Sequence, residues 1–260
     1  MRFNFYKAML KILFAALCTF LMVPGVQAKE KYKGTFIYIP LDDRPVTYSY
    51  PVKNLQAAGY EILTPPEKYL ASADRTCDPD KLWQWLVENA PDADAAVISS
   101  DALIYGGVVA SRTHFFDETT LQARVQRLEM LRERLPMPLY VYSTLMRTPR
   151  ASYGNVEPPY YSKIGPAIFR YSELLDKEDT TGLTLRESLA KKAIKNNLPQ
   201  ADLNDWLQRR LKNYHVNKSL TELTAKYRFH YLAIGKDDNA PLSATHMEAR
   251  YIKRDAFALS

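Results

Sequence analysis

The chain has 260 residues, 47% of them hydrophobic, and a formal net charge of +6. This length predicts one large domain with an ample core. No dense stripe of Lys and Arg with interleaved aromatic residues occurs, so we expect no nucleic-acid partner.

The first 28 residues have the three parts of a secretory signal peptide. Basic residues come first, an apolar run covers residues 12–23, Pro24 breaks the helix, and residues 26–28 fit the small-x-small cleavage rule. The apolar run is shorter than the about 20 residues of a spanning helix, so we expect cleavage before Lys29 and not a retained anchor. Cleavage would lower the net charge to +3, because the segment carries three basic and no acidic residues. We expect an exported protein, periplasmic or extracellular, with no stable membrane span after cleavage.

Five apolar runs rich in β-branched and aromatic residues predict strands. They cover residues 35–41, 61–64, 95–99, 139–143 and 231–234. Most are nearly continuous apolar runs, which is typical of parallel strands covered on both faces.

Helical patterns lie between the predicted strands. Asp78 and Asp117 are predicted N-caps of helices over residues 79–89 and 118–135. Capping boxes are predicted at Thr184 with Glu187 and at Ser219 with Glu222, and residues 202–214 carry apolar side chains at helical spacing. Residues from about 160 to 225 are therefore predicted to form a mostly helical insertion between the fourth and fifth strands.

This alternation predicts an α/β fold with a parallel sheet. Residues 29–260 would form a single α/β domain, and five strands fit either an open sheet or a partial (β/α) barrel. A helix is expected to begin within residues 245–254, and no strand follows it. We therefore expect the chain to be truncated at its C-terminus.

Ligands of parallel sheets and barrels bind at the carboxyl ends of the strands. Acidic residues follow three of the five predicted strands, and arginines lie nearby. The candidate residues are Asp42, Asp43 and Arg44 after the first strand, Asp101, Tyr105, Gly106, Gly107 and Arg112 after the third, Arg147 after the fourth, and Asp237, Asp238 and Asn239 after the fifth.

Each candidate also has a purely structural interpretation. Asp42 or Asp43 could pair with Arg44, and Asp101 could be a helix N-cap. The two glycines could form a tight turn or let a ligand approach the backbone. Asp237 and Asp238 are the strongest functional candidates, because adjacent carboxylates repel each other and a plain turn does not need both.

Other chemistries lack their motifs. The four histidines show no zinc-ligand spacing, and the sequence contains neither a G-x-S-x-G elbow nor a P-loop. Cys77 would be the single cysteine of the mature chain, so an internal disulfide is excluded. After these exclusions, the sequence favours a site whose chemistry depends on carboxylate groups.

Four segments together resemble one bacterial family, catalogued as domain of unknown function 4127. They are residues 38–45, 64–66, 99–112 and 235–241, in the family's order, and the resemblance covers roughly residues 35–252. It implies an often exported protein and supplies no reaction; members usually continue well beyond the last segment. A looser likeness is to glycosidases that act on N-acetylhexosamines, which use paired acids at a strand end as Asp237 and Asp238 are placed here.

The hypothesis favoured by these patterns is an exported carbohydrate-active hydrolase without a cofactor. Asp237 and Asp238 would be its catalytic pair, because glycoside hydrolysis needs one protonated and one ionised carboxyl group. The other candidate residues would bind a small-molecule or saccharide ligand. Two alternatives stay open: a hydrolase assisted by Mg²⁺ or Ca²⁺ held by the same aspartates, and a non-catalytic envelope protein that binds saccharides.

Overall fold

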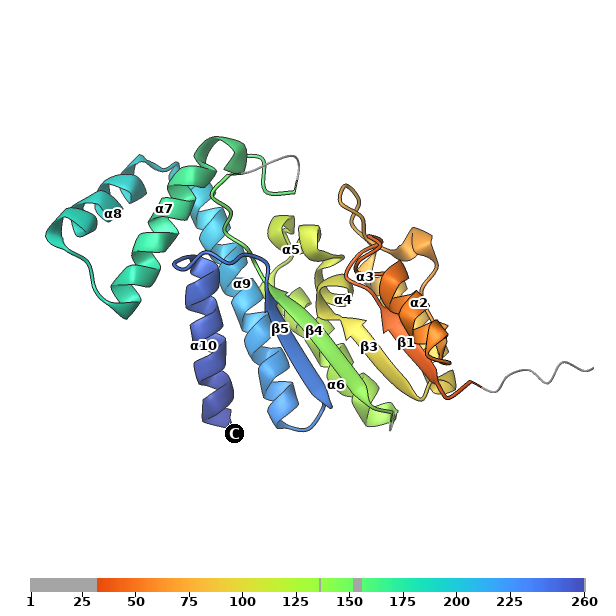
Figure 1. Cartoon of the computed structure of the whole chain (residues 1–260). Coiled ribbons are helices and arrows are strands. Elements are labelled where there is room, and N and C mark those ends of the chain that lie inside the picture. Colours follow the sequence, from red (N-terminus) through yellow and green to blue (C-terminus); the bar gives the residue numbers. More distant parts are fainter. Residues whose placement is uncertain (1–31, 136, 152–155, 260) are drawn as a thin grey trace, which may run out of the picture. The chain divides into compact units, whose positions relative to one another are not determined.

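Five strands form a single sheet in the computed structural model, which describes residues 32–135, 137–151 and 156–259. They are β1 (Thr35–Ile39), β2 (Glu61–Leu63), β3 (Ala95–Ser99), β4 (Leu139–Leu145) and β5 (Tyr231–Lys236). All neighbours are parallel, in the order β2-β1-β3-β4-β5 (Figure 1). The predicted α/β fold with a parallel sheet is therefore confirmed, and of its two forms the open sheet is the one observed. The predicted signal peptide lies outside the described residues.

The strand positions follow the apolar runs, and their ends differ by one or two residues. β1 stops before Pro40, which has no N–H to donate. β4 and β5 both extend beyond the predicted runs, because their backbones stay paired up to Leu145 and Lys236, past Thr144 and Gly235. A ladder follows backbone pairing and not side-chain hydropathy, so the interruption of each apolar run did not mark the end of the strand.

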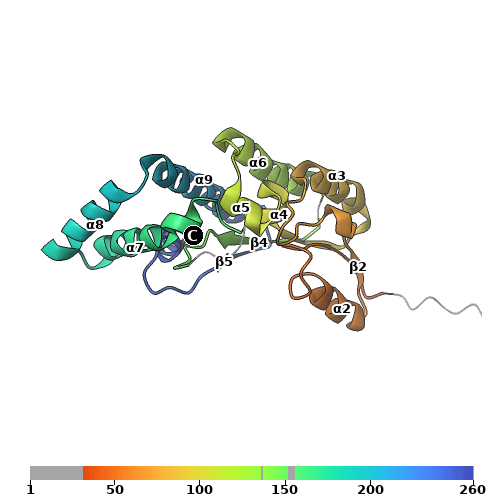
Figure 2. The same cartoon turned by 90° about the horizontal axis from the view of Figure 1, so that it is seen from above.

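Helices cover the two faces of the sheet unequally. The helices that connect the strands are α2 (Ser49–Ala57), α3 (Pro79–Asn89), α4 (Ser100–Tyr105), α5 (Val108–Thr113) and α6 (Glu118–Arg134), with short 3₁₀ turns at Glu67–Tyr69 and Ala90–Asp92. Figure 2 shows α3, α6 and α9 over one face and α2 over the other. Two-sided covering is the doubly wound arrangement that this strand order implies.

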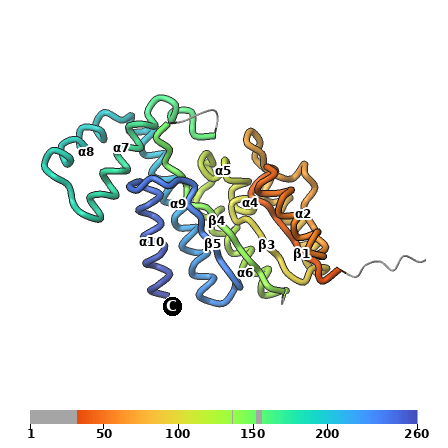
Figure 3. Tube along the Cα trace, in the orientation of Figure 1, coloured from red at the N-terminus to blue at the C-terminus, as the bar shows by residue number. Residues whose placement is uncertain are grey.

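The predicted helical insertion is present between β4 and β5. It consists of α7 (Tyr161–Thr180), α8 (Leu185–Asn197) and α9 (Gln200–Ala225), which the trace in Figure 3 shows leaving the sheet and returning to it. After β5, the chain ends in α10 (Ala244–Leu259). None of the described helices combines the length and hydropathy needed to cross a membrane.

Most predicted helix starts are confirmed. The side chains of Asp78 and Asp117 accept backbone hydrogen bonds at the starts of α3 and α6, and Thr184 forms a capping box with Glu187. The predicted cap at Ser219 is wrong, because α9 runs through it without a break. Ser219 instead donates to the side chain of Gln122 on α6 (2.9 Å).

Two apolar clusters hold the layers together. The larger one joins the sheet to α3, α6 and the second half of α9 through side chains such as Ile37, Ile98, Val141 and Leu128. The smaller one joins α7 to α9 around Tyr161 and Trp206 and includes Ala244 of α10. The insertion therefore has a core of its own, which fixes α7 and α9 beside the ends of β4 and β5.

Candidate functional site

The carboxyl ends of the five parallel strands meet at one edge of the sheet, and we call this the carboxyl edge. The chain leaves β1 towards β2 on one side and leaves β3 towards β4 on the other. The point between β1 and β3 is a topological switch point, where open α/β sheets bind ligands. The predicted site residues follow these strands.

Asp42 and Arg44 follow β1 and bind each other. The buried carboxylate of Asp42 accepts a hydrogen bond from Nε of Arg44 (2.8 Å) and contacts its Nη2 (2.6 Å). Burial opposes ionisation of Asp42, but the hydrogen bonds from Arg44 and Thr47 outweigh it and lower the pKa of Asp42. The Arg44 side chain is 51% exposed. Asp42 thus orients a guanidinium that solvent can reach.

Asp43 points to a different partner. Its carboxylate lies 3.5 Å from Nη2 of Arg75 and is partly exposed.

The hydrogen bond to Asp42, and the negative charges of Asp237 and Asp43, raise the pKa of Arg44, although burial opposes this. Arg44 therefore interacts electrostatically with an acid from each of two strand ends.

Asp101 is completely buried at the start of α4. Ser99 is the N-cap of that helix, so Asp101 does not have this role. Its two carboxylate oxygens accept hydrogen bonds from the backbone N–H and the hydroxyl of Thr144 on β4, both at 2.9 Å. Desolvation by burial raises the pKa of Asp101 to about 7, against the lowering effect of those bonds. Through these two hydrogen bonds, Asp101 holds the segment directly after β3 against the end of β4.

Gly106 and Gly107 form the junction of α4 and α5, and both have positive φ, of 94° and 118°. A Cβ atom on Gly106 would lie 2.6 Å from the carbonyl oxygen of Cys77, and one on Gly107 would lie 2.5 Å from Cβ of Ala71. Close packing against the segment before α3 thus accounts for both glycines. Tyr105 is also buried, with its ring stacked on that of His114.

Arg112 on α5 connects two acids from distant parts of the chain. Its buried guanidinium forms an ion pair with Asp237 after β5 and lies 3.6 Å from Glu157. Nε of Arg147, after β4, donates to the same Glu157 oxygen (2.6 Å). Burial raises the pKa of Glu157, although both guanidinium groups oppose this effect. Glu157 was missed by sequence reasoning, because it lies in an irregular loop with no motif around it.

The adjacent aspartates after β5 point to different partners. Asp237 contacts Arg112, and its side chain remains 30% exposed. Asp238 accepts hydrogen bonds from the backbone N–H of Thr148 (2.8 Å) and the hydroxyl of Thr245 (2.6 Å), with longer ones from Ala240 and Ser243. Asp238 therefore ties together the loops after β4 and β5. Asn239, next in the chain, is exposed.

Eight of the charged residues at the carboxyl edge can be grouped into two layers. The accessible layer consists of Asp43, Arg44, Arg147 and Asp237, and the supporting layer of Asp42, Asp101, Arg112 and Glu157. Three members of the supporting layer hold members of the accessible layer in place, and Asp101 holds the strand ends. No group of three or more His, Cys, Asp or Glu among the described residues is close enough to hold a metal ion.

The sequence profile of one family, described as "Protein of unknown function (DUF4127)", matches residues 36–259. The chain belongs to this family. The match confirms the resemblance drawn from the motifs, and it includes residues of all five strands of the sheet. Searches of curated proteins and of solved structures give no match. The family's description names no reaction.

In this DUF4127 chain, the helical insertion also supports the site. Arg210 of α9 donates to the backbone carbonyl of Arg147 (3.2 Å) and to the hydroxyl of Thr148 (3.0 Å). Glu248 of α10 accepts two hydrogen bonds from Arg210, at 2.7 and 2.8 Å. No sequence pattern marked Arg210 for this role, because α9 carries several polar side chains that only the structure shows to be buried. The insertion thus fixes the loop that carries Arg147.

Proposed function

We propose that this chain is an exported carbohydrate-active hydrolase whose site is the accessible layer at the carboxyl edge. One observation carries the proposal: the partly exposed carboxylate of Asp237 is held by the buried Arg112 at the carboxyl edge of the sheet. Carboxylates and guanidinium groups are suited to binding sugar hydroxyls, because both form strong, directional hydrogen bonds. The signal-peptide pattern of residues 1–28 supports export.

Hydrolysis of a glycoside needs two carboxyl groups on either side of the scissile bond. Asp237 and Asp43 are the acids of the accessible layer, and the exposed Arg44 interacts with both. We assign Asp237 and Asp43 to the acid–base pair and Arg44 to ligand orientation. Asp238, which sequence reasoning paired with Asp237, has each oxygen engaged by donors of the surrounding loops, so its role in the proposal is to position Asp237.

The first experiment is a turnover assay of the purified chain on a panel of aryl glycosides that includes N-acetylhexosaminides. The proposal expects turnover that Asp237→Asn abolishes and Asp43→Asn strongly reduces. Lys192→Gln on the outer face of α8, which removes a charge far from the carboxyl edge, is the matched control and should retain full turnover. Turnover that survives Asp237→Asn would contradict the assignment. Loss of turnover on adding a chelator would favour the Mg²⁺- or Ca²⁺-assisted alternative.

A second candidate, a saccharide-binding protein without turnover, is favoured by one observation. Both accessible acids, Asp43 and Asp237, form an ion pair with an arginine. Such pairs can hydrogen-bond to the hydroxyl groups of a sugar without catalysing a reaction. It predicts a silent glycoside panel and saturable saccharide binding that Arg44→Met weakens. Calorimetric titration with the same sugars therefore separates the two candidates.

A further inference from the structure

Two partly exposed arginines at the carboxyl edge, Arg44 and Arg147, are held in place in the same way. In each of them Nε donates to a buried carboxylate, which belongs to Asp42 for Arg44 (2.8 Å) and to Glu157 for Arg147 (2.6 Å). The Arg44 side chain is 51% exposed and that of Arg147 is 26% exposed. A guanidinium group that is already ordered loses little conformational entropy when it binds a ligand.

The terminal nitrogens of these two arginines are largely unused. Asp42 contacts Nη2 of Arg44 (2.6 Å), but Nη1 of Arg44 and both Nη atoms of Arg147 bond to no described residue. The nearby carboxylates are more fully engaged, because each oxygen of Asp42, Asp101 and Asp238 accepts at least one hydrogen bond. The free donors of this edge are thus concentrated on guanidinium groups, and a ligand with anionic acceptor atoms complements them.

Both arginines belong to one charge network around Asp237. Hydrogen bonding to its buried acid raises the pKa of Arg44, and the negative charge of Asp237 adds to this effect. Glu157, which binds Arg147, also lies 3.6 Å from Nη1 of Arg112, the ion-pair partner of Asp237. Two guanidinium groups that follow β1 and β4 are therefore connected to the same acid, the one assigned above to acid–base catalysis.

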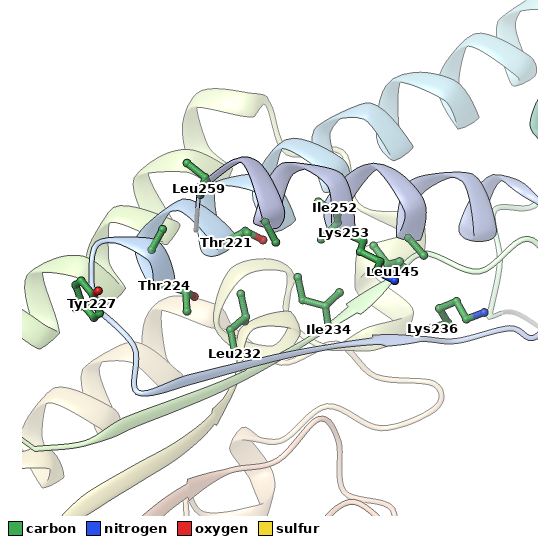
Figure 4. A pocket seen from close by; sticks show the side chains of 13 residues that line it. Leu145, Thr221, Thr224, Tyr227, Leu232, Ile234, Lys236, Ile252, Lys253 and Leu259 are labelled. Atoms are coloured by element: carbon green, nitrogen blue, oxygen red, sulfur yellow. The ribbon is translucent and has the colours of Figure 1, made fainter. Parts of the chain in front are cut away.

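The neighbouring lysine lies in different surroundings. Lys236 directly precedes Asp237, but its side chain lines an apolar groove with Leu232 and Ile234 of β5 and with residues of α9 and α10 (Figure 4). Side chains along a strand alternate between its two faces, which accounts for the different surroundings of Lys236 and Asp237. The cations of the network around Asp237 are guanidinium groups, which bind a planar carboxylate through two parallel hydrogen bonds.

The acids of the accessible layer select among anionic groups. Asp43 and Asp237 would repel a phosphate group, with about two negative charges at pH 7, more strongly than a carboxylate, which carries one. Phosphate sites also commonly use backbone N–H groups of glycine-rich loops. The two glycines of this edge, Gly106 and Gly107, instead pack closely against the segment before α3. A carboxylate is therefore the anionic group that this edge suits best.

We infer that the saccharide bound at the carboxyl edge is acidic, a sugar that carries a carboxylate, as uronic acids do. The terminal N–H groups of Arg44 and Arg147 bind that carboxylate, and Asp42 and Glu157 hold the two guanidinium groups in place. The inference rests on the proposed function in taking a saccharide as the ligand. It applies equally to a hydrolase and to a binding protein without turnover.

The first test compares matched ligands on the unmodified chain, so it does not depend on the folding of any variant. The probes are the methyl glycosides of glucuronic and galacturonic acid in both anomeric forms, each beside its methyl ester, which keeps the shape and removes the charge. In titrations followed by NMR, at least one acid should bind saturably and about tenfold more tightly than its ester. Added salt should weaken the binding of the acid alone, because it screens the ion pairs.

The second test removes the two guanidinium groups one at a time. Arg44→Met and Arg147→Met should each weaken binding of the acid roughly tenfold and leave the affinity for the ester unchanged. Arg44→Lys keeps the charge but loses the planar fork, so it should cause a smaller loss and leave less strain on the buried Asp42. Arg186→Met, at an exposed arginine on α8, is the matched control and should not change either affinity.

Three results would overturn the inference. They are the absence of saturable binding by every acid, equal affinity for each acid and its methyl ester, and tighter binding of sulfated sugars than of the uronic acids. Turnover of neutral glycosides without any preference for acidic ones would remove this inference and retain the hydrolase. Acid-specific binding without turnover would retain the inference and remove the hydrolase.

Discussion

The accessible side chains of the carboxyl edge are held in place by buried side chains of the supporting layer. Replacing a residue of the supporting layer should therefore destabilise the fold more than replacing an accessible one. Asp237 and Arg147 are accessible, but Arg112 and Glu157 beneath them are almost completely shielded from water. A buried charge tolerates the loss of its partner poorly, because solvent cannot replace the missing interaction.

Replacing Arg112 by Met should therefore destabilise the fold by about 3–5 kcal/mol, the usual cost of removing one partner from a buried ion pair. Urea denaturation followed by circular dichroism measures this difference. Arg170→Met is the control, because Arg170 forms an exposed pair with Glu173 whose loss should cost about 1 kcal/mol or less. Similar destabilisation by the two variants would contradict the two-layer description.

Asp101 should make stability depend on pH in a defined direction. Its pKa is about 7 in the folded chain, against about 3.9 in an unfolded one. A raised folded-state pKa gives a stability contribution that is complete below pH about 4 and is lost as the pH rises to about 7. The loss is on the order of 4 kcal/mol.

The isosteric Asp101→Asn variant has no charge to bury and can still bond to Thr144 through its amide group. Its stability relative to the unmodified chain should therefore increase between pH 4 and pH 7. Urea titrations at several pH values test this; parallel pH profiles for the two proteins would show that Asp101 does not have a raised pKa.

At the scale of elements, the backbone geometry at the junction of α4 and α5 does not tolerate side chains at its two glycines. Gly106 has positive φ, and a Cβ atom there would overlap the backbone of Cys77. Gly106→Ala should cost about 1–3 kcal/mol from strain, with a further penalty from the overlap. Gly182 also has positive φ but has open space around it, so Gly182→Ala reports the strain without the overlap. Thermal denaturation should rank Gly106→Ala clearly below Gly182→Ala.

The elements themselves could largely be predicted because their signals are local. The caps at Asp78, Asp117 and Thr184 bond to backbone N–H groups two or three residues away, so the sequence contains both partners side by side. The cap at Ser219 was predicted from the same pattern and is wrong. Its neighbours Leu220 and Thr221 are buried on a continuous helical face, and this tertiary packing outweighs the local pattern.

The site could be predicted only to the level of its strand ends. Parallel topology places Asp42, Asp101 and Asp237 at one edge, and the alternation of strands and helices indicated that topology. The partner of each residue is set by side-chain geometry between distant segments. No sequence pattern distinguishes Asp237, which contacts Arg112 and stays accessible, from Asp238, which is enclosed by loop donors.

At the scale of the whole molecule, local stability should differ between the sheet and the insertion. α8 has no buried residue, and Leu185 and Leu189 are largely exposed on it, whereas α3 and α6 bury several side chains against the sheet. Local opening is easiest where few apolar contacts are lost.

Limited trypsin digestion should therefore cut first within residues 185–197, at Arg186 or at the lysines of α8. Mass spectrometry of the first fragments checks this. A first cut within α3 or α6, both of which contain basic residues, would mean that the sheet side opens more easily than the insertion.

The ion pair between Arg112 and Asp237 joins residues 125 positions apart. While the chain is being synthesised, α5 emerges long before Asp237, which follows β5. The guanidinium stays hydrated until then, since desolvating it alone is too costly. We expect the cluster around Asp237 to be among the last parts of the molecule to lose its hydrating water during folding. Pulse-labelled hydrogen exchange should then find the amides of α5 protected only after β5 has joined the sheet.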